Sequence, residues 1–456
     1  MNTDLLRAPW LIAVARAFSD AGEPLFAVGG AVRNGLMDLP ASDVDLCGPA
    51  RPQRVAGLCE GTPVRAVLRA AHFGTVELHV SDGQGRHMAE YTTFRVDSYR
   101  GGHQPVAVRF ADTAEVDALR RDFSVNALYR PLHPDPDAPA AVIDPTGGLD
   151  HLRRRVLHTV TYDPDQVLKD DGLRILRAAR FQAELGLQPT AALLASARKF
   201  APILRDIAPE RIRDELTRLL MSDRKYPMLE HATPPVASGL GTVADTGAWP
   251  YVFGPLAPNV RALAALAQYR APDGLAETAG RMALLFFRED AAVLGERMRQ
   301  LRFSAVDAAA AEAALRTTRR IAENALGLME ALRVGPILME HAARALTALA
   351  AAGEDCLPAV ERAGSILLDM KRAGMPQTLR ELAVHGDDLL ALCERLRAPR
   401  SRIGQTLDAL WRETVEGNIA NEKPALLAYA ESLLRGAATG DNRPEEPAAG
   451  RTAGRP

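Results

Sequence analysis

Two glycines followed by two aspartates constrain this chain more than any other feature of its sequence. The stretch Val28-Gly29-Gly30-Ala31-Val32-Arg33 places a glycine pair between a short apolar segment and the start of a helical pattern. A strand, a glycine turn and a helix start together direct backbone N–H groups at an anion. Arg33, one turn into the predicted helix, would add a positive charge. The stretch therefore predicts a phosphate-binding turn.

The two aspartates follow in the extended segment Ser42-Asp43-Val44-Asp45-Leu46. Strand side chains repeat every second residue, so Asp43 and Asp45 face the same side. Two like charges on one face are costly unless a cation lies between them. Carboxylate oxygens suit Mg²⁺, which takes one or two carboxylates together with substrate phosphates. Gly-Gly and Asp-x-Asp pairs each occur in ordinary loops, but in this order and spacing they indicate nucleotidyl transfer.

More strands are expected after this point, over residues 64–68, 75–80, 87–94 and 106–110, with a hairpin turn at 81–85. An amphipathic helix is expected over residues 5–18. Glu90 lies on the returning strand of the hairpin, where it could complete the metal site as a third catalytic acid. The alternative is a solvated strand residue with no role.

Two later stretches repeat polar residues at helical spacing. A helix is expected over residues 115–129, where Asp122 and Asn126 are four apart and share one face. A second is expected over 163–181, where Asp171, Arg174 and Arg177 recur every third residue and Arg180 follows. Such stripes are usually surface ion pairs. Three arginines with few matching acids weaken that interpretation for the second stretch.

Composition bounds the class of protein. The 456 residues suggest about three domains, and 47% hydrophobic with 25% charged residues is ordinary for a globular chain. A net charge of −2 argues against coating of nucleic acid but leaves room for a local basic surface. Cys47, Cys59, Cys356 and Cys393 lack metal-like spacing and are expected to be buried, reduced thiols of a cytoplasmic protein. No signal peptide or membrane span is expected.

Strand signals fade after a turn at residues 143–150. A Pro- and Gly-rich stretch at 231–259 predicts a loop, and residues 260–435 read as successive helices. Four arginines around Pro399 are a candidate phosphate-contact patch or a solvated loop. Residues 436–456 have almost no large apolar side chains and are expected to be disordered.

Four ordered motifs resemble a known family. They are the Gly-Gly-x-Val-Arg turn with Asp-x-Asp, Arg-Arg-Asp-Phe-x-x-Asn-Ala at 120–127, Asp-x-x-Gly-Gly-x-x-x-Leu at 144–152, and Asp-Asp-x-x-Arg-x-x-Arg at 170–177. Together they resemble the class II tRNA nucleotidyltransferase and bacterial poly(A) polymerase family. The resemblance implies an α/β, polymerase β-like head with a mixed five-stranded sheet, followed by an all-α neck, body and tail. The expected divisions are 1–150 (catalytic head), 151–225 (nucleotide-reading neck), 226–435 (tRNA-binding body and tail) and 436–456 (disordered tail).

The resemblance also assigns roles. Asp43 and Asp45 would hold two Mg²⁺ ions, and the turn with Gly29, Gly30 and Arg33 would hold the triphosphate. The remaining nucleotide contacts would come from Arg121, Asp122 and Asn126 (sugar and phosphates), Asp171 and Arg174 (base), and Arg177 and Arg180 (support for either). Asn34 stands where the family usually has an acid, Asp170 stands where it usually has glutamate, and Gly172 adds flexibility to the reading helix.

Residues 71–76 (Ala-His-Phe-Gly-Thr-Val) are more similar to the CCA-adding branch of this family than to its poly(A) polymerases. The implied partners are tRNA, ATP and CTP, without DNA or membrane. Poly(A) synthesis, addition of C only or A only, and an inactive RNA-binding helical protein remain open. A Rossmann-type dinucleotide binder would need a Gly-x-Gly-x-x-Gly turn, which this sequence lacks.

Overall fold

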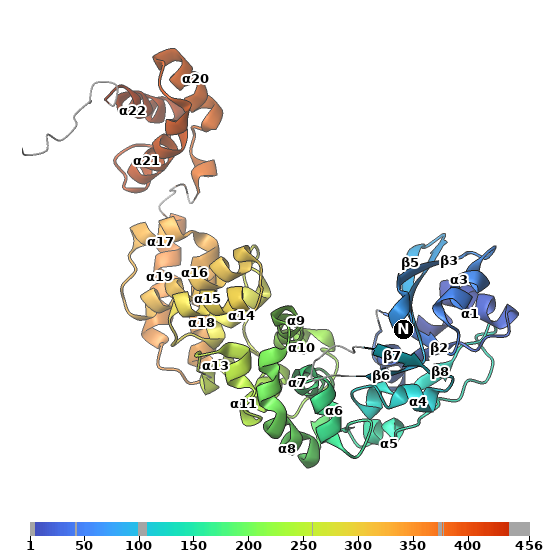
Figure 1. Cartoon of the computed structure of the whole chain (residues 1–456). Coiled ribbons are helices and arrows are strands. Elements are labelled where there is room, and N and C mark those ends of the chain that lie inside the picture. Colours follow the sequence, from blue (N-terminus) through green and yellow to red (C-terminus); the bar gives the residue numbers. More distant parts are fainter. Residues whose placement is uncertain are drawn as a thin grey trace, which may run out of the picture. The chain divides into compact units, whose positions relative to one another are not determined.

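The computed structural model describes residues 5–41, 43–98, 107–257, 259–372, 376 and 378–436. The chain divides into two compact units, residues 1–270 with 276–312, and residues 271–275 with 313–456. The first unit holds a mixed sheet and the helices that follow it (Figure 1). The second unit is helical throughout its described part.

The first unit contains a six-stranded sheet with the order β3–β4–β5–β2–β1–β8. Its strands are β1 (Phe26–Val28), β2 (Asp45–Gly48), β3 (Val64–Ala70), β4 (Thr75–Asp82), β5 (Gly85–Thr93) and β8 (Tyr129–Pro131). β2 and β5 run parallel, and the other neighbours run antiparallel. The predicted mixed sheet is confirmed, but it has six strands and not five; its edge strand β8 begins at Tyr129, the last residue of the helix predicted over 115–129.

A separate two-stranded ribbon follows β5. It pairs β6 (Arg95–Ser98) with β7 (Ala107–Phe110), so the strand predicted at 106–110 is not part of the main sheet. Val106 lies outside the described residues. Phe94 lies between β5 and β6: its backbone N–H donates to the carbonyl of Gly48 in β2, and its own carbonyl accepts from the N–H of Ala111.

One face of the sheet is covered by α1 (Pro9–Asp20) and α3 (Pro52–Cys59), as Figure 1 shows. The helix predicted over residues 5–18 is confirmed as a 3-10 turn, η1 (Leu5–Arg7), followed by α1. Val44 and Leu46 belong to the core on this covered face. Because strand side chains alternate, Asp43 and Asp45 point away from that core.

The helix predicted over residues 115–129 is wrong. It is replaced by α4 (Ala114–Ala118), the 3-10 turn η3 (Ser124–Asn126) and β8. Every residue from 122 to 129 is buried, a pattern that an amphipathic surface helix cannot satisfy. The backbone N–H of Ser124 instead donates to the carbonyl of His158, and β8 pairs with β1.

The helix predicted over residues 163–181 is divided into α6 (Pro164–Asp170) and α7 (Leu173–Leu185). Asp171, with φ −147° and ψ 104°, ends α6 in an extended conformation. A Cβ on Gly172 would lie 2.8 Å from Cγ2 of Ile203, so close packing explains glycine at this break. α7 packs against α9 (Pro209–Leu220) and α11 (Pro235–Asp245).

The loop predicted over residues 231–259 is also wrong in its centre, which holds α11 and α12 (Trp249–Phe253). Val236, Leu240 and Val243 recur at helical spacing and are buried. This short apolar stripe outweighs the neighbouring prolines and glycines, because it packs against α7.

The other helices of the first unit are α2 (Gly30–Leu36), α5 (Gly148–Arg153), α8 (Ala191–Phe200), α10 (Ser222–Lys225), α13 (Val260–Ala265), α14 (Glu277–Leu285) and α15 (Ala291–Gln300). α16 (Ala305–Ala322) crosses from one unit to the other. The second unit continues with α17 (Leu328–Val334), α18 (Pro336–Ala351), α19 (Leu357–Arg372), α20 (Gly386–Leu396), α21 (Ile403–Val415) and α22 (Lys423–Gly436).

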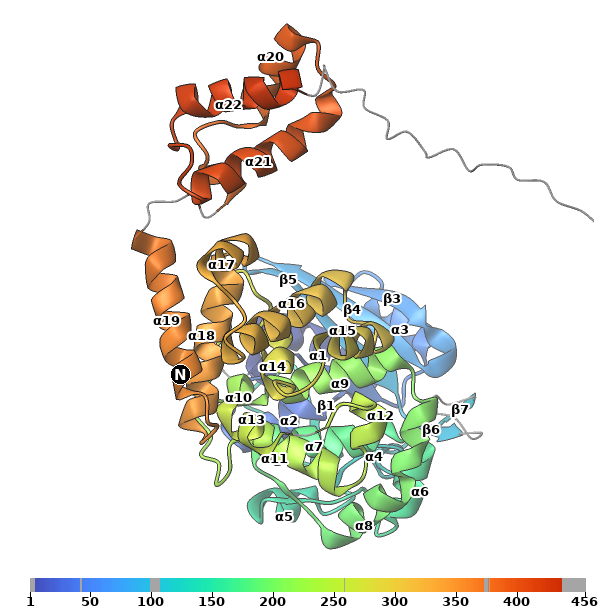
Figure 2. The same cartoon turned by 90° about the vertical axis from the view of Figure 1, so that its left-hand side faces the viewer.

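α20, α21 and α22 lie side by side (Figure 2) and share an apolar core that includes Leu389, Leu410 and Leu426. The predicted tail at 436–456 lies outside the described residues except for Gly436, which ends α22. None of the helices that the structure describes is long and apolar enough to cross a membrane. The four cysteines are free thiols and buried, as predicted.

Candidate active site

The glycine turn and the aspartates meet because β1 and β2 are neighbours. Val28 at the end of β1 is the cross-strand partner of Asp45 at the start of β2. Gly29 has φ +72° and ψ −130°, a conformation that residues with a Cβ rarely adopt. α2 begins at Gly30. The turn thus reverses the chain directly beside the Asp45 carboxylate, which lies 3.7 Å from the position of a Cβ on Gly29.

Asp43 and Asp45 line the same cavity, which has a volume of about 490 Å³. Desolvation in the cavity, together with the negative charge of Asp43, raises the pKa of Asp45 against the opposing effect of Arg121. A cation between the two carboxylates would relieve this cost. The pair therefore has the chemistry of a hard-metal site.

Glu90 is the register partner of Asp45 on the neighbouring strand β5. Desolvation is the largest cause that raises the pKa of Glu90, and the negative charge of Asp45 is the next. The two carboxylates therefore repel each other electrostatically. Glu90 does not line the cavity. Among the residues described, no three His, Cys, Asp or Glu side chains are grouped closely enough to hold a metal. The proposed third acid is adjacent to the pair but not assembled with it.

All other residues predicted for the site line this one cavity. They are Gly29, Gly30, Arg33, Asp43, Asp45, Arg121, Asp122, Asn126, Asp171, Arg174, Arg177 and Arg180. The sequence reasoning missed Asn34, Asp97, Arg120, Phe181, Glu184, Arg211, Arg218, Lys225 and Tyr226, which line it too. On α7, Phe181 and Glu184 follow Arg177 and Arg180 by four residues. Residues four apart share one face of a helix, so this spacing could have predicted that they line the cavity too.

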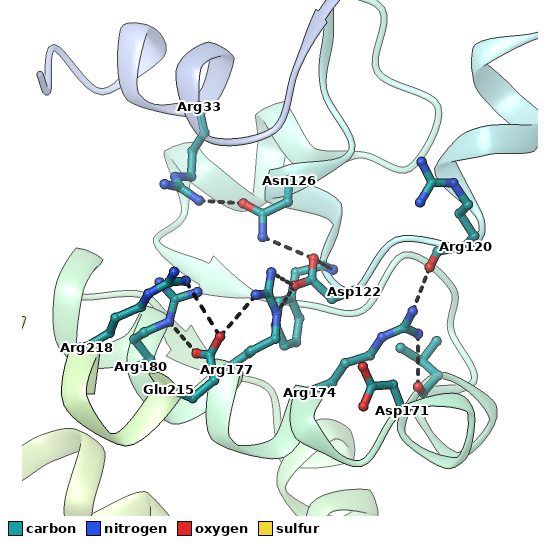
Figure 3. Close-up of polar contacts among 12 residues, drawn as sticks. Arg33, Arg120, Asp122, Asn126, Asp171, Arg174, Arg177, Arg180, Glu215 and Arg218 are labelled. Carbon is teal, nitrogen blue, oxygen red and sulfur yellow. Dashed lines mark hydrogen bonds and ion pairs between the residues drawn. The ribbon is translucent and has the colours of Figure 1, made fainter. Parts of the chain in front are cut away.

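A chain of hydrogen bonds joins the glycine turn to α7 (Figure 3). Arg33 donates through Nη1 to Oδ1 of Asn126, and Nδ2 of Asn126 donates to Oδ1 of Asp122 at 3.1 Å. Nε of Arg177 donates to the other carboxylate oxygen of Asp122 at 2.7 Å. Burial opposes the ionised form of Asp122, but Arg177 and Asn126 outweigh it and hold its pKa well below the usual range. The ionised carboxylate thus orients both partners.

Three guanidinium groups surround the ring of Phe181. Those of Arg33, Arg177 and Arg180 lie 5.1, 5.4 and 4.3 Å from its centroid. Glu215 on α9 forms an ion pair with Arg180 at 2.7 Å and accepts a hydrogen bond from Arg177 at 3.3 Å. The aromatic ring and the shared carboxylates hold these guanidinium groups in fixed positions at the wall of the cavity.

Asp171 and Arg174 are fixed separately, because the break before α7 removes Asp171 from the helix. Oδ1 of Asp171 accepts from the backbone of Leu173 at 3.0 Å, and Oδ2 lies 2.6 Å from Nη2 of Arg211. Arg174 donates to the backbone carbonyls of Val167 at 3.0 Å and Arg120 at 2.6 Å (Figure 3). The predicted single helical stripe is corrected: Asp171 reaches the cavity from the break, whereas Arg174 reaches it from α7.

Comparison with known proteins identifies the family to which this chain belongs. Residues 25–158 match the family model described as "Poly A polymerase head domain". Residues 186–233 match the model described as "Probable RNA and SrmB- binding site of polymerase A". Residues 277–430 match the model described as "tRNA nucleotidyltransferase domain 2 putative". The chain is 31% identical over 423 residues to the CCA-adding enzyme of Geobacillus kaustophilus (strain HTA426), covering 92% of this chain and 95% of the relative. The chain belongs to the family of CCA-adding enzymes.

A second relative, the CCA-adding enzyme of Geobacillus stearothermophilus, is 30% identical over 431 residues, with 92% of this chain and 95% of the relative covered. The crystal structure of the Bacillus stearothermophilus CCA-adding enzyme in complex with CTP is similar with a TM-score of 0.68 and 27% identity, over 96% of this chain and 99% of that one. The Thermotoga maritima CCA-adding enzyme complexed with tRNA shares the fold, with a TM-score of 0.59 and 18% identity over 93% of this chain and 95% of that one.

Membership of this family confirms the resemblance that the four motifs predicted. The chain is a nucleotidyltransferase with a polymerase-type head, and CCA addition to tRNA is the activity of its family. The family also implies the use of a divalent metal. The acid pair Asp43 and Asp45 fits that requirement, since it offers carboxylate oxygens and a bound cation would offset the effect of Asp43 that raises the pKa of Asp45.

Proposed function

We propose that this enzyme completes the 3′ end of tRNA with C, C and A from CTP and ATP, using the one cavity that Asp43, Arg33 and Asp171 line. The observation that carries the proposal is this convergence. A metal-type acid pair, a positive turn and a fixed carboxylate–guanidinium pair all line the same 490 Å³ cavity. The CTP complex of the 27% identical neighbour supports CTP as a substrate.

Asp43 and Asp45 are the proposed ligands of two Mg²⁺ ions, with Glu90 as a neighbouring acid that modulates them. Mg²⁺ bound there would lower the pKa of the RNA 3′-hydroxyl and neutralise charge on the triphosphate. The chain itself orients the reactants. Arg33, fixed by Asn126, and Arg177, fixed by Asp122, present positive charge to the phosphates at set positions.

Asp171 and Arg174 are proposed to read the base. The exocyclic amines of C and A can donate to a carboxylate, and their neighbouring ring nitrogens can accept from a guanidinium. G and U present the reverse pattern at that edge. Arg174 is held by two backbone carbonyls, and Asp171 by a backbone N–H and Arg211, so neither group needs to be ordered when the nucleotide binds.

We assign residues 1–150 to transfer, 151–225 to nucleotide reading and 226–435 to tRNA binding. The arginines around Pro399 are candidate phosphate contacts. Two of them are held in exposed ion pairs, Arg395 with Glu431 at 2.7 Å and Arg400 with Glu394 at 2.8 Å. Such pairs are weak enough to exchange for RNA phosphates. Buried free thiols and a tRNA substrate support a cytoplasmic enzyme.

The test is the sequence of the RNA product. A tRNA transcript that lacks its terminal CCA is incubated with CTP, with ATP and with both, and the products are sequenced. CC with CTP alone and CCA with both nucleotides is the expected result, and a transcript that already ends in CCA should not be extended. A long A tail would indicate a poly(A) polymerase, and a single nucleotide type under all conditions a C-only or A-only enzyme. An unchanged transcript would indicate an inactive RNA-binding protein.

A further inference from the structure

A second cavity opens beside the first, along α9 and α10. It has a volume of about 410 Å³ and is lined by Asp43, Arg180, Glu184, Arg218, Met221, Arg224 and Lys225. Five of these residues, namely Asp43, Arg180, Glu184, Arg218 and Lys225, also line the first cavity. The base-reading residues Asp171 and Arg174 are not among its lining. The second cavity therefore extends from the acid end of the site.

Two of its four cations are neutralised by nearby carboxylates. Arg180 is bound to Glu215 at 2.7 Å and to Glu184 at 3.4 Å. Arg224 is bound to Glu277 at 2.6 Å. These two arginines are committed to contacts within the protein and have little capacity left for a ligand.

The other two cations, Arg218 and Lys225, have weaker contacts with carboxylates of the protein. Nη1 of Arg218 lies 3.9 Å from a Glu215 oxygen, but that carboxylate already binds Arg180 at 2.7 Å, and the Arg218 side chain is 59% exposed. Nζ of Lys225 lies 5.9 Å from the ring centroid of Tyr226. In the part of the chain that the structure describes, no carboxylate oxygen lies within 4.0 Å of the Lys225 ammonium. Two cations facing one cavity repel each other unless an anion lies between them.

The position of Lys225 relates this cavity to the glycine turn. The neighbouring Tyr226 hydroxyl accepts from Asn34 at 2.8 Å, and Oδ1 of Asn34 accepts from Arg33 at 2.9 Å. Lys225 is thus connected, through two side chains, to the arginine proposed to hold the triphosphate. We therefore place Lys225 on the side of the acid pair where Arg33 is proposed to hold the triphosphate.

We propose that Arg218 and Lys225 form a phosphate subsite that holds the β- and γ-phosphates of the incoming nucleotide and then the pyrophosphate product. The inference rests on the proposed function. In that reaction the RNA 3′-oxygen bonds to the α-phosphorus, the bond from that phosphorus to the bridging oxygen breaks, and its electron pair leaves with pyrophosphate. The hydroxyl proton passes to solvent. A backbone phosphate of the RNA acceptor end has similar chemistry, and the experiment distinguishes the two sources.

The experiment uses the full-length chain and the variants Arg218→Gln, Lys225→Gln and their double. Arg213→Gln is the matched control, because Arg213 lies on the same helix but lines neither cavity. Inhibition of CMP incorporation by inorganic pyrophosphate, KM for CTP and KM for RNA are measured. We expect the double variant to weaken pyrophosphate inhibition about tenfold and to raise KM for CTP, with KM for RNA unchanged. Inhibition by CMP, which lacks the terminal phosphates, should be the same in all variants.

Two outcomes overturn the proposal. A raised KM for RNA with unchanged pyrophosphate inhibition would place an RNA phosphate in this cavity. If pyrophosphate inhibition, KM for CTP and KM for RNA were all unchanged, Arg218 and Lys225 would bind neither the nucleotide phosphates nor an RNA phosphate. Calorimetric titration of each protein with pyrophosphate in the presence of Mg²⁺ needs no transfer reaction, so it tests the subsite even if the chain does not extend tRNA. The thermal unfolding curve of each variant shows whether it is folded.

Discussion

The side-chain amide of Asn34 donates a hydrogen bond to the hydroxyl of Tyr226 at 2.8 Å, across 192 positions of the sequence. The same amide donates to the carbonyl of Pro40, and its oxygen accepts from both Nε and Nη2 of Arg33, at 3.2 and 2.9 Å. Every polar group of this buried amide is used. Asn34 stands where the resembled family usually has an acid, and here it ties the glycine-turn arginine to the end of α10.

Asn34 should therefore act as a positioning residue for Arg33. We expect Asn34→Leu to lower kcat/KM for CTP about tenfold to a hundredfold, because Arg33 loses an acceptor and Tyr226 a donor in a buried site. Asn34→Asp should lose less activity than Asn34→Leu, since a carboxylate accepts from Arg33 and the Tyr226 hydroxyl can turn to donate to it, although the hydrogen bond to the Pro40 carbonyl is lost. Steady-state kinetics with CTP and RNA varied separately check this. Equal losses in the two variants, or a loss confined to KM for RNA, would contradict the positioning role.

Asp45→Ala should abolish transfer while leaving tRNA affinity and folding nearly intact, because it removes a metal ligand at the cavity and not a core residue. Turnover is measured at saturating RNA, and affinity by a binding titration. Asp82→Asn in the hairpin is a suitable control, since that carboxylate is far along the sheet from β2 and lines no part of the site. More than a few per cent of wild-type turnover in Asp45→Ala would disprove the metal assignment.

Asp171→Ala should relax base selection as well as slow the reaction. Loss of a buried acceptor costs roughly 1–3 kcal/mol, so kcat/KM for CTP and ATP should fall about tenfold to a hundredfold, and that for UTP and GTP less. The four nucleotides are compared in the wild type, the variant and Asp165→Asn, a partly exposed acid at the start of α6 that lines neither cavity. Equal proportional losses for all four would mean that Asp171 only holds Arg211 and the helix break in place.

Acid should loosen the segment around β8, because Asp117 is buried and ionised there. It accepts from Arg120 at 2.7 Å, Arg121 at 2.9 Å and the Tyr129 hydroxyl at 2.9 Å. Burial opposes ionisation, but Arg121 and Arg120 outweigh it and lower the pKa of Asp117 to about 2. A depressed carboxyl pKa contributes stability that is complete above the unfolded-state value near 3.9 and disappears as the pH falls through about 2.

The expected contribution at neutral pH is about 2–3 kcal/mol from this group. Hydrogen exchange of the β8 amides is compared between the wild type and Asp117→Asn, which keeps the volume of the side chain but not its charge. The variant should exchange faster at neutral pH, and the difference should shrink as the pH falls from about 4 to about 2. A difference that is constant over this range would exclude ionisation of Asp117 as its cause.

RNA affinity should fall steeply with salt, since phosphate contacts from arginines dominate binding to an A-form acceptor stem. Affinity for a tRNA transcript is measured at several salt concentrations. Replacement of Arg395 and Arg400 by glutamine should reduce the slope of log affinity against log salt by about one for each phosphate that is no longer bound. A nearly flat plot of log affinity against log salt for the wild type would contradict this prediction.

Local sequence was sufficient for several features that depend on nearest neighbours along the chain. The glycine turn was predictable because Gly29 needs a positive φ that few other residues adopt, and the common face of Asp43 and Asp45 because strand side chains alternate. The hairpin between β4 and β5 and the helix α1 followed from turn chemistry and apolar period in the same way. The motif residues from 120 to 180 were found through their resemblance to a family, even where their predicted structure was wrong.

Tertiary structure decided what depends on burial and on distant partners. Residues 122–129 have helical spacing, but all are buried, so their backbone bonds to other segments and forms β8. Asp171 is extended between α6 and α7, next to Gly172, where a Cβ would lie 2.8 Å from Cγ2 of Ile203. Arg211, Arg218, Lys225 and Tyr226 reach the cavity only because α9 and α10 lie close to α7. No local pattern encodes such an approach, since the free energy that selects it comes from apolar surface buried between elements far apart in the sequence.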